Sequence, residues 1–209
     1  MIFLIFILLS PSSLLFSQNV ETDPLSFFPS EVGNYWEYEP DNPKYNYTIV
    51  RDSIAEDGSK FIFYFDPPFY YGANYKIDTN NNVYFTPQHY PELLYKLSAD
   101  SGDTWMVRDV TPSGGGNRIE ARVNDTYKAY VLGVVTDVMD ISYYELNMGD
   151  TLINDTSYHI QRKILASGFG LVWQGDGATR PTVLQGCIID GKAYGTIVSV
   201  EEEATVIQD

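Results

Sequence analysis

Cysteine, histidine and basic side chains are scarce in this sequence. One Cys and two His occur among 209 residues. A single cysteine excludes an intramolecular disulfide, and two histidines without a Cys pair or a His-Glu-x-x-His pattern supply no recognisable metal site. The chain has 13 Lys and Arg against 28 Asp and Glu, a net charge of −15. Because nucleic acids and anionic membranes are bound through clustered cations, neither is an expected partner.

The few residues with reactive side chains also lack partners in the sequence. Cys187 lies in the apolar run VLQGCIID and is interpreted as a small buried hydrophobic residue, since no nearby His or cation would lower its pKa. His89 and His159 are interpreted as structural or exposed. No nucleophile elbow of the Gly-x-Ser-x-Gly type is present, so the sequence predicts no catalytic residue and no cofactor.

Two loops resemble ligand-binding motifs but lack the residues that bind. DTNNN, residues 78–82, begins like a calcium loop, yet Val83 and His89 stand where that loop needs Gly and Glu. It therefore predicts a hairpin turn. SGGGN, residues 113–117, lacks the Lys and Ser or Thr of a phosphate loop and is interpreted as a flexible connection.

Long apolar runs are missing except at the start of the chain, and that one is well short of the ~20 residues that span a bilayer. Residues 1–17 are typical of a secretory signal peptide cleaved after Ser17, although no Lys or Arg precedes the apolar run. The protein is therefore expected to be secreted or at the cell surface. A flexible leader (18–26), one β-rich domain (27–199) and an acidic linker or tail (200–209) follow.

Aromatic residues are abundant, with 17 Tyr, 11 Phe and 3 Trp. They recur in short alternating runs such as NYWEYE and KYNYTIV, which is the pattern of half-buried strands. Turns are predicted at Asp57-Gly58 and at Thr79 to Asn82. Tyr90, Leu93, Leu94 and Leu97 have helical spacing and predict one short helix, with an irregular strand as the alternative. Further strands are predicted from TWMVRDV, RIEARVN, TYKAYVLGVVTDV, DISYYEL, SYHIQRKILA, GLVW, TVLQGCIID and KAYGTIVSV.

These patterns predict an all-β fold with at most one short helix. We expect an antiparallel curved sheet or partly open β-barrel, with a two-sheet β-sandwich as the alternative. The loop DPPFYYGANY is the candidate binding surface, because its rings could stack on sugars or meet a protein. Its aromatic residues could equally be structural, and they are Phe69, Tyr70, Tyr71 and Tyr75.

The opening of the domain, FFPSEVGNYWEYE, predicts a structural anchor rather than an active site. Pro29 stiffens the approach, Gly33 turns the chain, and Trp36 with Tyr38 places two large rings on the core side. Burial of rings of this size is worth a few kcal/mol each, at ~25 cal/mol per Å² of apolar area.

The same stretch resembles the start of a loose group of exported bacterial proteins, mostly of the Bacteroidetes–Ignavibacteria lineage and without known function. ASGFGLVW, with Gly168 and Gly170, is similar to a glycine-bracketed strand of that group, and LQGCIIDGKAYGT to its closing hairpin. Such proteins often continue through an acidic linker into a type IX secretion sorting domain. This sequence stops at SVEEEATVIQD, so that route is implied only if it is a fragment.

Three functions are compatible with these observations. The first is a secreted, non-catalytic binding or surface-associated protein whose partner is a glycan, a lipid or an envelope protein. The second is an extracellular hydrolase that cleaves glycans with paired carboxylates, for which 28 acids offer many pairs. The third is a structural module that accompanies a sorting domain. Oligomeric state and ligand identity do not follow from the sequence.

Overall fold

Antiparallel strands make up most of the described chain. The computed structural model describes residues 22–39, 46–65, 74–86, 91–109, 118–147, 150, 152–154 and 156–198. In chain order its elements are the 3-10 helix η1 (Pro24–Phe27) and the strands β1 (Tyr35–Glu39), β2 (Asn46–Ile54), β3 (Lys60–Phe65), β4 (Asn74–Ile77), β5 (Asn82–Phe85), β6 (Glu92–Lys96), β7 (Thr104–Arg108), β8 (Arg118–Val131), β9 (Val134–Leu146), β10 (Tyr158–Ala166), β11 (Gly170–Gly175), β12 (Thr182–Ile189) and β13 (Lys192–Gly195).

All these strands belong to one sheet. Its order is β6-β5-β4-β3-β2-β1-β12-β11-β10-β9-β8-β7, and β13 pairs with β12 outside this path. Each half of the chain is a meander in which consecutive strands are neighbours, and the pairing of β1 with β12 joins the two halves. Strands β6 and β7 are consequently the two free ends of the path.

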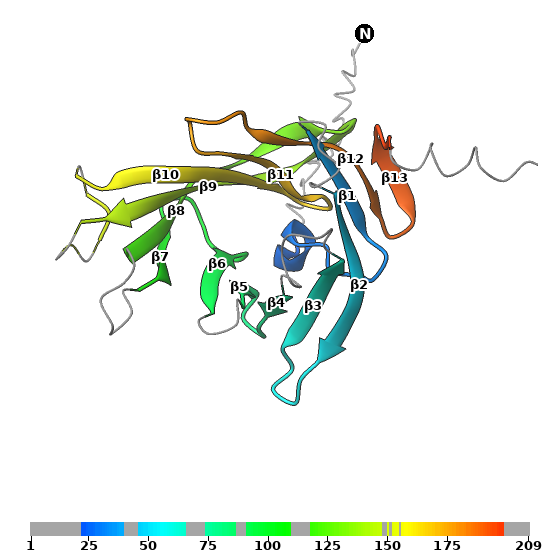
Figure 1. Cartoon of the computed structure of the whole chain (residues 1–209), viewed down its shortest axis with the longest axis horizontal. Helices are drawn as coiled ribbons and strands as arrows, with labels where there is room; N and C mark the ends of the chain where they lie inside the picture. Colours follow the sequence, from blue (N-terminus) through cyan, green and yellow to red (C-terminus); the bar gives the residue numbers. More distant parts are fainter. Residues whose placement is uncertain are drawn as a thin grey trace, which may run out of the picture.

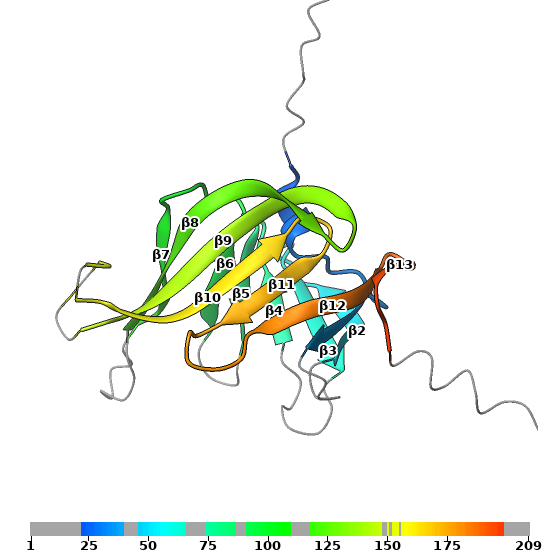
Figure 2. The ribbon, with the colours of Figure 1, turned by 90° about the horizontal axis from the view of Figure 1, so that it is seen from above.

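The sheet curls until these two ends face each other, as Figure 1 and Figure 2 show from two directions. The Nε1 atom of Trp105 on β7 donates to the carbonyl of Leu93 on β6 at 3.0 Å. Arg108 and Glu92 form an ion pair of 3.3 Å across the same gap. The predicted all-β fold, a strongly curved sheet close to a closed barrel, is therefore confirmed. The alternative of two stacked sheets is wrong for the described residues, since one continuous sheet contains all their strands.

The helix η1 lies within the outline of the curved sheet in Figure 1 and is fixed to the turn after β10. The backbone N–H of Gly168 donates to the carbonyl of Ser26 at 2.7 Å, and the hydroxyls of Ser26 and Ser167 are 2.7 Å apart. Thr22 also donates to Asp137. The chain is thus attached to the sheet from Thr22 onward, before the predicted domain start at residue 27.

Both predicted hairpin turns are confirmed. Gly58 between β2 and β3 has a φ of +80°, and Asn81 between β4 and β5 has a φ of +61°. This left-handed backbone suits Gly and Asn, so the turn residues agree with the strand pairing on either side.

The predicted helix around Leu93 and Leu94 is wrong. Glu92–Lys96 is the strand β6, which pairs with β5 through Val83↔Tyr95 and Asn82↔Lys96. Tyr95 is the buried residue of this strand, and Leu97 is buried in the turn that follows it. Pairing with β5 and burial of Tyr95 outweigh the weak helical spacing of the leucines.

The division of the sequence between residues 118 and 146 also differs from the prediction. RIEARVN and TYKAYV form one 14-residue strand, β8, and the chain turns at Leu132-Gly133 within the segment predicted as continuous. Leu132 has a φ of +45° and Gly133 a φ of +90°. A Leu at the first position of such a turn gives no Asn-Gly or Asp-Gly signal, which is why the pattern missed it.

No helix among the described residues is long and apolar enough to cross a bilayer. Several predictions concern residues outside the described part of the chain, and these are the signal peptide 1–17, the linker 200–209, the loop 113–117, His89, Phe69, Tyr70 and Tyr71.

Candidate functional site

Five aromatic rings, one from each of the strands β1 to β5, form a continuous surface on the concave side of the sheet. They are Tyr38, Tyr47, Tyr64, Tyr75 and Phe85, called the aromatic wall below. Successive ring centroids are 5.7, 6.3, 5.4 and 5.5 Å apart. Three of the four contacts are edge-to-face, the arrangement that the ring quadrupoles favour. Tyr75 and Phe85 are directly paired and therefore point to the same face, whereas the other rings meet diagonally across neighbouring strands.

The aromatic wall borders a cavity of about 170 Å³ in the interior of the curved sheet. A second cavity of about 270 Å³ adjoins it and shares Tyr75 and Lys163 as lining residues. A cavity of about 150 Å³ accommodates benzene in a well-studied engineered protein, so each space is large enough for part of an organic ligand. Besides Tyr38, Tyr47, Tyr64 and Tyr75, the first cavity is lined by Phe28, Pro29, Trp36, Tyr95, Lys163, Gly170, Leu171, Gln174 and Thr182.

The predicted anchor residues hold this cavity in shape. Trp36 donates from Nε1 to the carbonyl of Phe169 at 2.7 Å, and the Tyr38 hydroxyl donates to the carbonyl of Leu171 at 2.8 Å. A Cβ at Gly170 would lie 3.4 Å from Pro29 and 3.8 Å from the Trp36 ring nitrogen. Both are ordinary van der Waals distances, and what favours glycine at this position is its φ of +77°.

Three of the interior hydroxyls have no hydrogen-bond partner among the described residues. They belong to Tyr64, Tyr75 and Tyr95. Burial raises the pKa of Tyr75 to about 12 and also raises the pKa values of Tyr64 and Tyr95, with neighbouring tyrosines adding to the effect. All three remain neutral near pH 7 and can donate to, or accept from, a ligand in the cavity.

A row of three polar side chains completes the cavity lining. Lys163 on β10 pairs with Gln174 on β11, and Gln174 pairs with Thr182 on β12, so the three side chains share one face of the sheet. All three border the first cavity. None of them has a hydrogen bond or ion pair to a described residue. We call Lys163, Gln174 and Thr182 the polar row.

Lys163 is a cation that is partly buried among rings rather than beside an acid. Its Nζ lies 5.5 Å from the ring centre of Tyr95 and 5.2 Å from that of Tyr143. Desolvation lowers its pKa to about 8, while the charge of Glu92 acts in the opposite direction. Glu92 itself is within ion-pair distance of Arg108. Glu92 is also the one acid among the described residues that line the two cavities.

Of the aromatic loop predicted as a binding surface, the structure describes Tyr75, which lies in strand β4 and in the wall shared by both cavities. Of the predicted anchor, Pro29, Trp36, Tyr38 and Gly170 line the first cavity.

The other two anchor glycines lie at turns outside the cavity lining. Gly33 has a φ of +93° just before β1, and Gly168 has a φ of +80° just after β10. Both positions suit glycine because other residues are strained in this backbone region.

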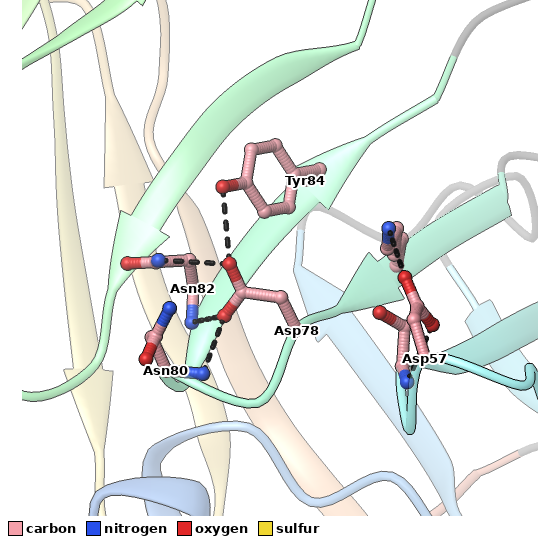
Figure 3. Close-up of polar contacts among 7 residues, drawn as sticks. Asp57, Asp78, Asn80, Asn82 and Tyr84 are labelled. Atoms are coloured by element: carbon pink, nitrogen blue, oxygen red, sulfur yellow. Dashed lines mark hydrogen bonds and ion pairs between the residues drawn. The ribbon is translucent and has the colours of Figure 1, made fainter.

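The calcium-like segment is a turn stabilised by its own aspartate (Figure 3). The Asp78 carboxylate accepts from the backbone N–H groups of Asn80 and Asn82 at 2.8 and 2.9 Å. It also accepts from the Asn82 amide at 2.9 Å and from the Tyr84 hydroxyl at 3.1 Å. Its oxygens are thus used within the hairpin, as the sequence predicts for a turn.

Cys187 is fully buried, as predicted, and burial raises the pKa of its thiol to about 11. His159 is exposed on β10 and its ring meets that of Tyr144 edge-on at 5.4 Å. No group of three or more His, Cys, Asp or Glu side chains among the described residues is arranged to hold a metal ion.

Sequence reasoning missed Lys163 and Tyr95. A signal for Lys163 was present, because it lies two residues before Leu165, which is buried, on a strand whose inward positions recur every second residue. A bulge near Ile160 interrupts the two-residue period earlier in the strand, so the sequence pattern does not show it. Tyr95 was missed because its segment was assigned to a helix.

Comparison with known proteins places the chain in no established family. No family description matches it, and no curated protein matches it. Among solved structures, it is similar to the crystal structure, at 2.70 Å resolution, of a "putative lipoprotein" from Parabacteroides distasonis ATCC 8503. The two share 14% identity over 80% of this chain and 97% of that one, with a TM-score of 0.34.

Proposed function

We propose that this chain is an exported, non-catalytic binding protein that holds a small, largely apolar molecule inside its curved sheet. The observation that carries the proposal is the cavity bordered by the aromatic wall, with three tyrosine hydroxyls left without partners. A concave apolar space with a few polar groups is the usual form of a small-molecule site. Export is supported by the signal-like residues 1–17.

Among the partners expected from sequence, the cavity favours a lipid-like molecule over a glycan. A sugar carries hydroxyls around its whole edge, and most of them would lose their hydrogen bonds to water among aromatic rings. A hydrolase would need two acids facing one space. Glu92 alone among the described residues lining the cavities is acidic, and it pairs with Arg108.

Binding of a neutral fluorescent probe, N-phenyl-1-naphthylamine, tests this function. Its fluorescence should rise when it enters the cavity of the wild-type protein. Thr182→Trp places a ring on the cavity side of β12 and should weaken probe binding at least tenfold. Val183→Trp adds the same ring on the opposite face of the same strand, since neighbouring side chains alternate, and should bind like wild type.

A wild-type protein that does not bind the probe, or equal binding by all three proteins, would refute the proposal. The first result would instead favour the structural module that the sequence also allows. Thermal melts of the two tryptophan variants show whether each still folds.

A further inference from the structure

The polar row includes a positive charge, that of Lys163, which forms no ion pair with a described residue and is offset only by the more distant charge of Glu92. Lys163 reaches from β10 to the ring of Tyr95 on β6, on the other side of the cavity. Two aromatic faces offset part of the cost of removing an ammonium group from water. They supply neither a negative charge nor a hydrogen-bond acceptor of full strength.

We propose, building on the function above, that the ligand is a monocarboxylic acid whose carboxylate binds the polar row and whose apolar body lies on the aromatic wall. Lys163 supplies the charge, and the Gln174 amide and the Thr182 hydroxyl supply further donors beside it. These three groups together match the acceptor oxygens of one carboxylate.

The charge of the site favours a monoanion. Lys163 is the one basic residue among the described residues that line the two cavities, so a dianion such as a phosphate monoester would carry an unneutralised charge into an aromatic interior. Glu92 lines the second cavity and repels anions there, which directs the carboxylate to the first cavity and the apolar end toward Tyr75 and Phe85.

A matched pair of ligands tests the assignment. 4-Phenylbutanoate and 4-phenylbutan-1-ol have the same apolar body and differ at the head group. Calorimetric titration at pH 6.5 should show that wild-type protein binds the acid at least tenfold more tightly than the alcohol.

The variants separate charge from packing. Lys163→Met should remove the preference for the acid and leave affinity for the alcohol within about threefold, while Lys163→Arg should keep the preference. Lys192→Met is the control, because Lys192 also lies over a ring, that of Tyr194 at 4.8 Å, but does not line the cavity. It should behave as wild type.

The preference should also depend on pH. The groups facing the Lys163 ammonium are Tyr95 and Glu92 from β6, Tyr143 from β9 and Tyr75 from β4. The tyrosines stay neutral because burial raises their pKa values, so Lys163, with a pKa of about 8, is the group that changes charge between pH 7 and 10. The preference should fall over this range in wild type and stay flat in Lys163→Met.

Equal affinity of wild type for acid and alcohol would overturn the carboxylate assignment while leaving the binding function intact. So would an acid preference that survives in Lys163→Met. If wild type bound neither compound nor the neutral probe, the binding function itself would fail.

Discussion

Lys163 makes the clearest prediction at the scale of a single residue. Without ligand, the pKa of Lys163 in the folded protein is about 8, whereas a lysine in the unfolded chain has a pKa of ~10.4. Folding therefore disfavours the charged form of Lys163. The cost is fully present below about pH 8 and disappears as the pH rises toward ~10.4. Lys163→Met should therefore unfold with a free energy roughly 1–2 kcal/mol higher than wild type at pH 7.

Urea unfolding of both proteins at pH 7 and pH 10 measures this effect. The difference should shrink by more than half at the higher pH. Lys192→Met should stay within about 0.5 kcal/mol of wild type at both, since its side chain is exposed. If the free energies of unfolding of Lys163→Met and wild type differed by the same amount at pH 7 and pH 10, the effect would come from packing instead of charge.

At the scale of the element, the β4–β5 hairpin depends on one carboxylate. Burial alone would raise the pKa of Asp78, but hydrogen bonds from Asn82, Asn80 and Tyr84 together outweigh it, so its pKa is lowered. Asp78→Ala removes all four bonds and should cost about 1–2 kcal/mol at pH 7. Asp57→Ala, at the neighbouring exposed hairpin, should cost less because Asp57 accepts from Ser59 and Lys76 only.

The pH dependence of unfolding checks this account. A lowered folded-state pKa gives stability that is present above the unfolded value of ~3.9 and is lost as the pH falls below it. The difference in free energy of unfolding between wild type and Asp78→Ala should consequently become smaller below about pH 4. If this difference in free energy of unfolding were the same at pH 3 as at pH 7, the carboxylate charge would not be what stabilises the turn.

The elements themselves were largely predictable, and the exceptions have physical causes. Alternating rings identified β1 and β2, and Gly58 and Asn81 marked the β2–β3 and β4–β5 turns, because period and backbone geometry are local properties. The β6 strand and the Leu132 turn were not predictable, since both are decided by pairing with other strands. Lys163 could be placed on the inner face in principle, but its distance to Tyr95 depends on how far the sheet curls.

At the scale of the whole molecule, the seam between β6 and β7 is where the curved sheet is held least strongly. No backbone pairing joins these two strands in the described part of the chain. Trp105 and Arg108 connect the seam through single contacts with Leu93 and Glu92, and Tyr143 on β9 adds a hydrogen bond to Leu94 on β6. Glu92, Leu94 and Val107 also line the second cavity, so opening the seam would expose that cavity to solvent.

Trp105→Phe should make the seam open more often, because it removes the 3.0 Å hydrogen bond to Leu93 and keeps an aromatic ring in place. Loss of a bond worth about 1–1.5 kcal/mol predicts roughly tenfold faster amide exchange in β6, with β8 and β9 unchanged.

If ligands enter here, the association and dissociation rates of the fluorescent probe should rise together while its affinity changes little. Trp173→Phe is the matched control, because the Trp173 ring lines neither cavity. Unchanged exchange in β6 would show that other contacts hold the seam, and faster exchange with unchanged probe rates would place the ligand entrance elsewhere.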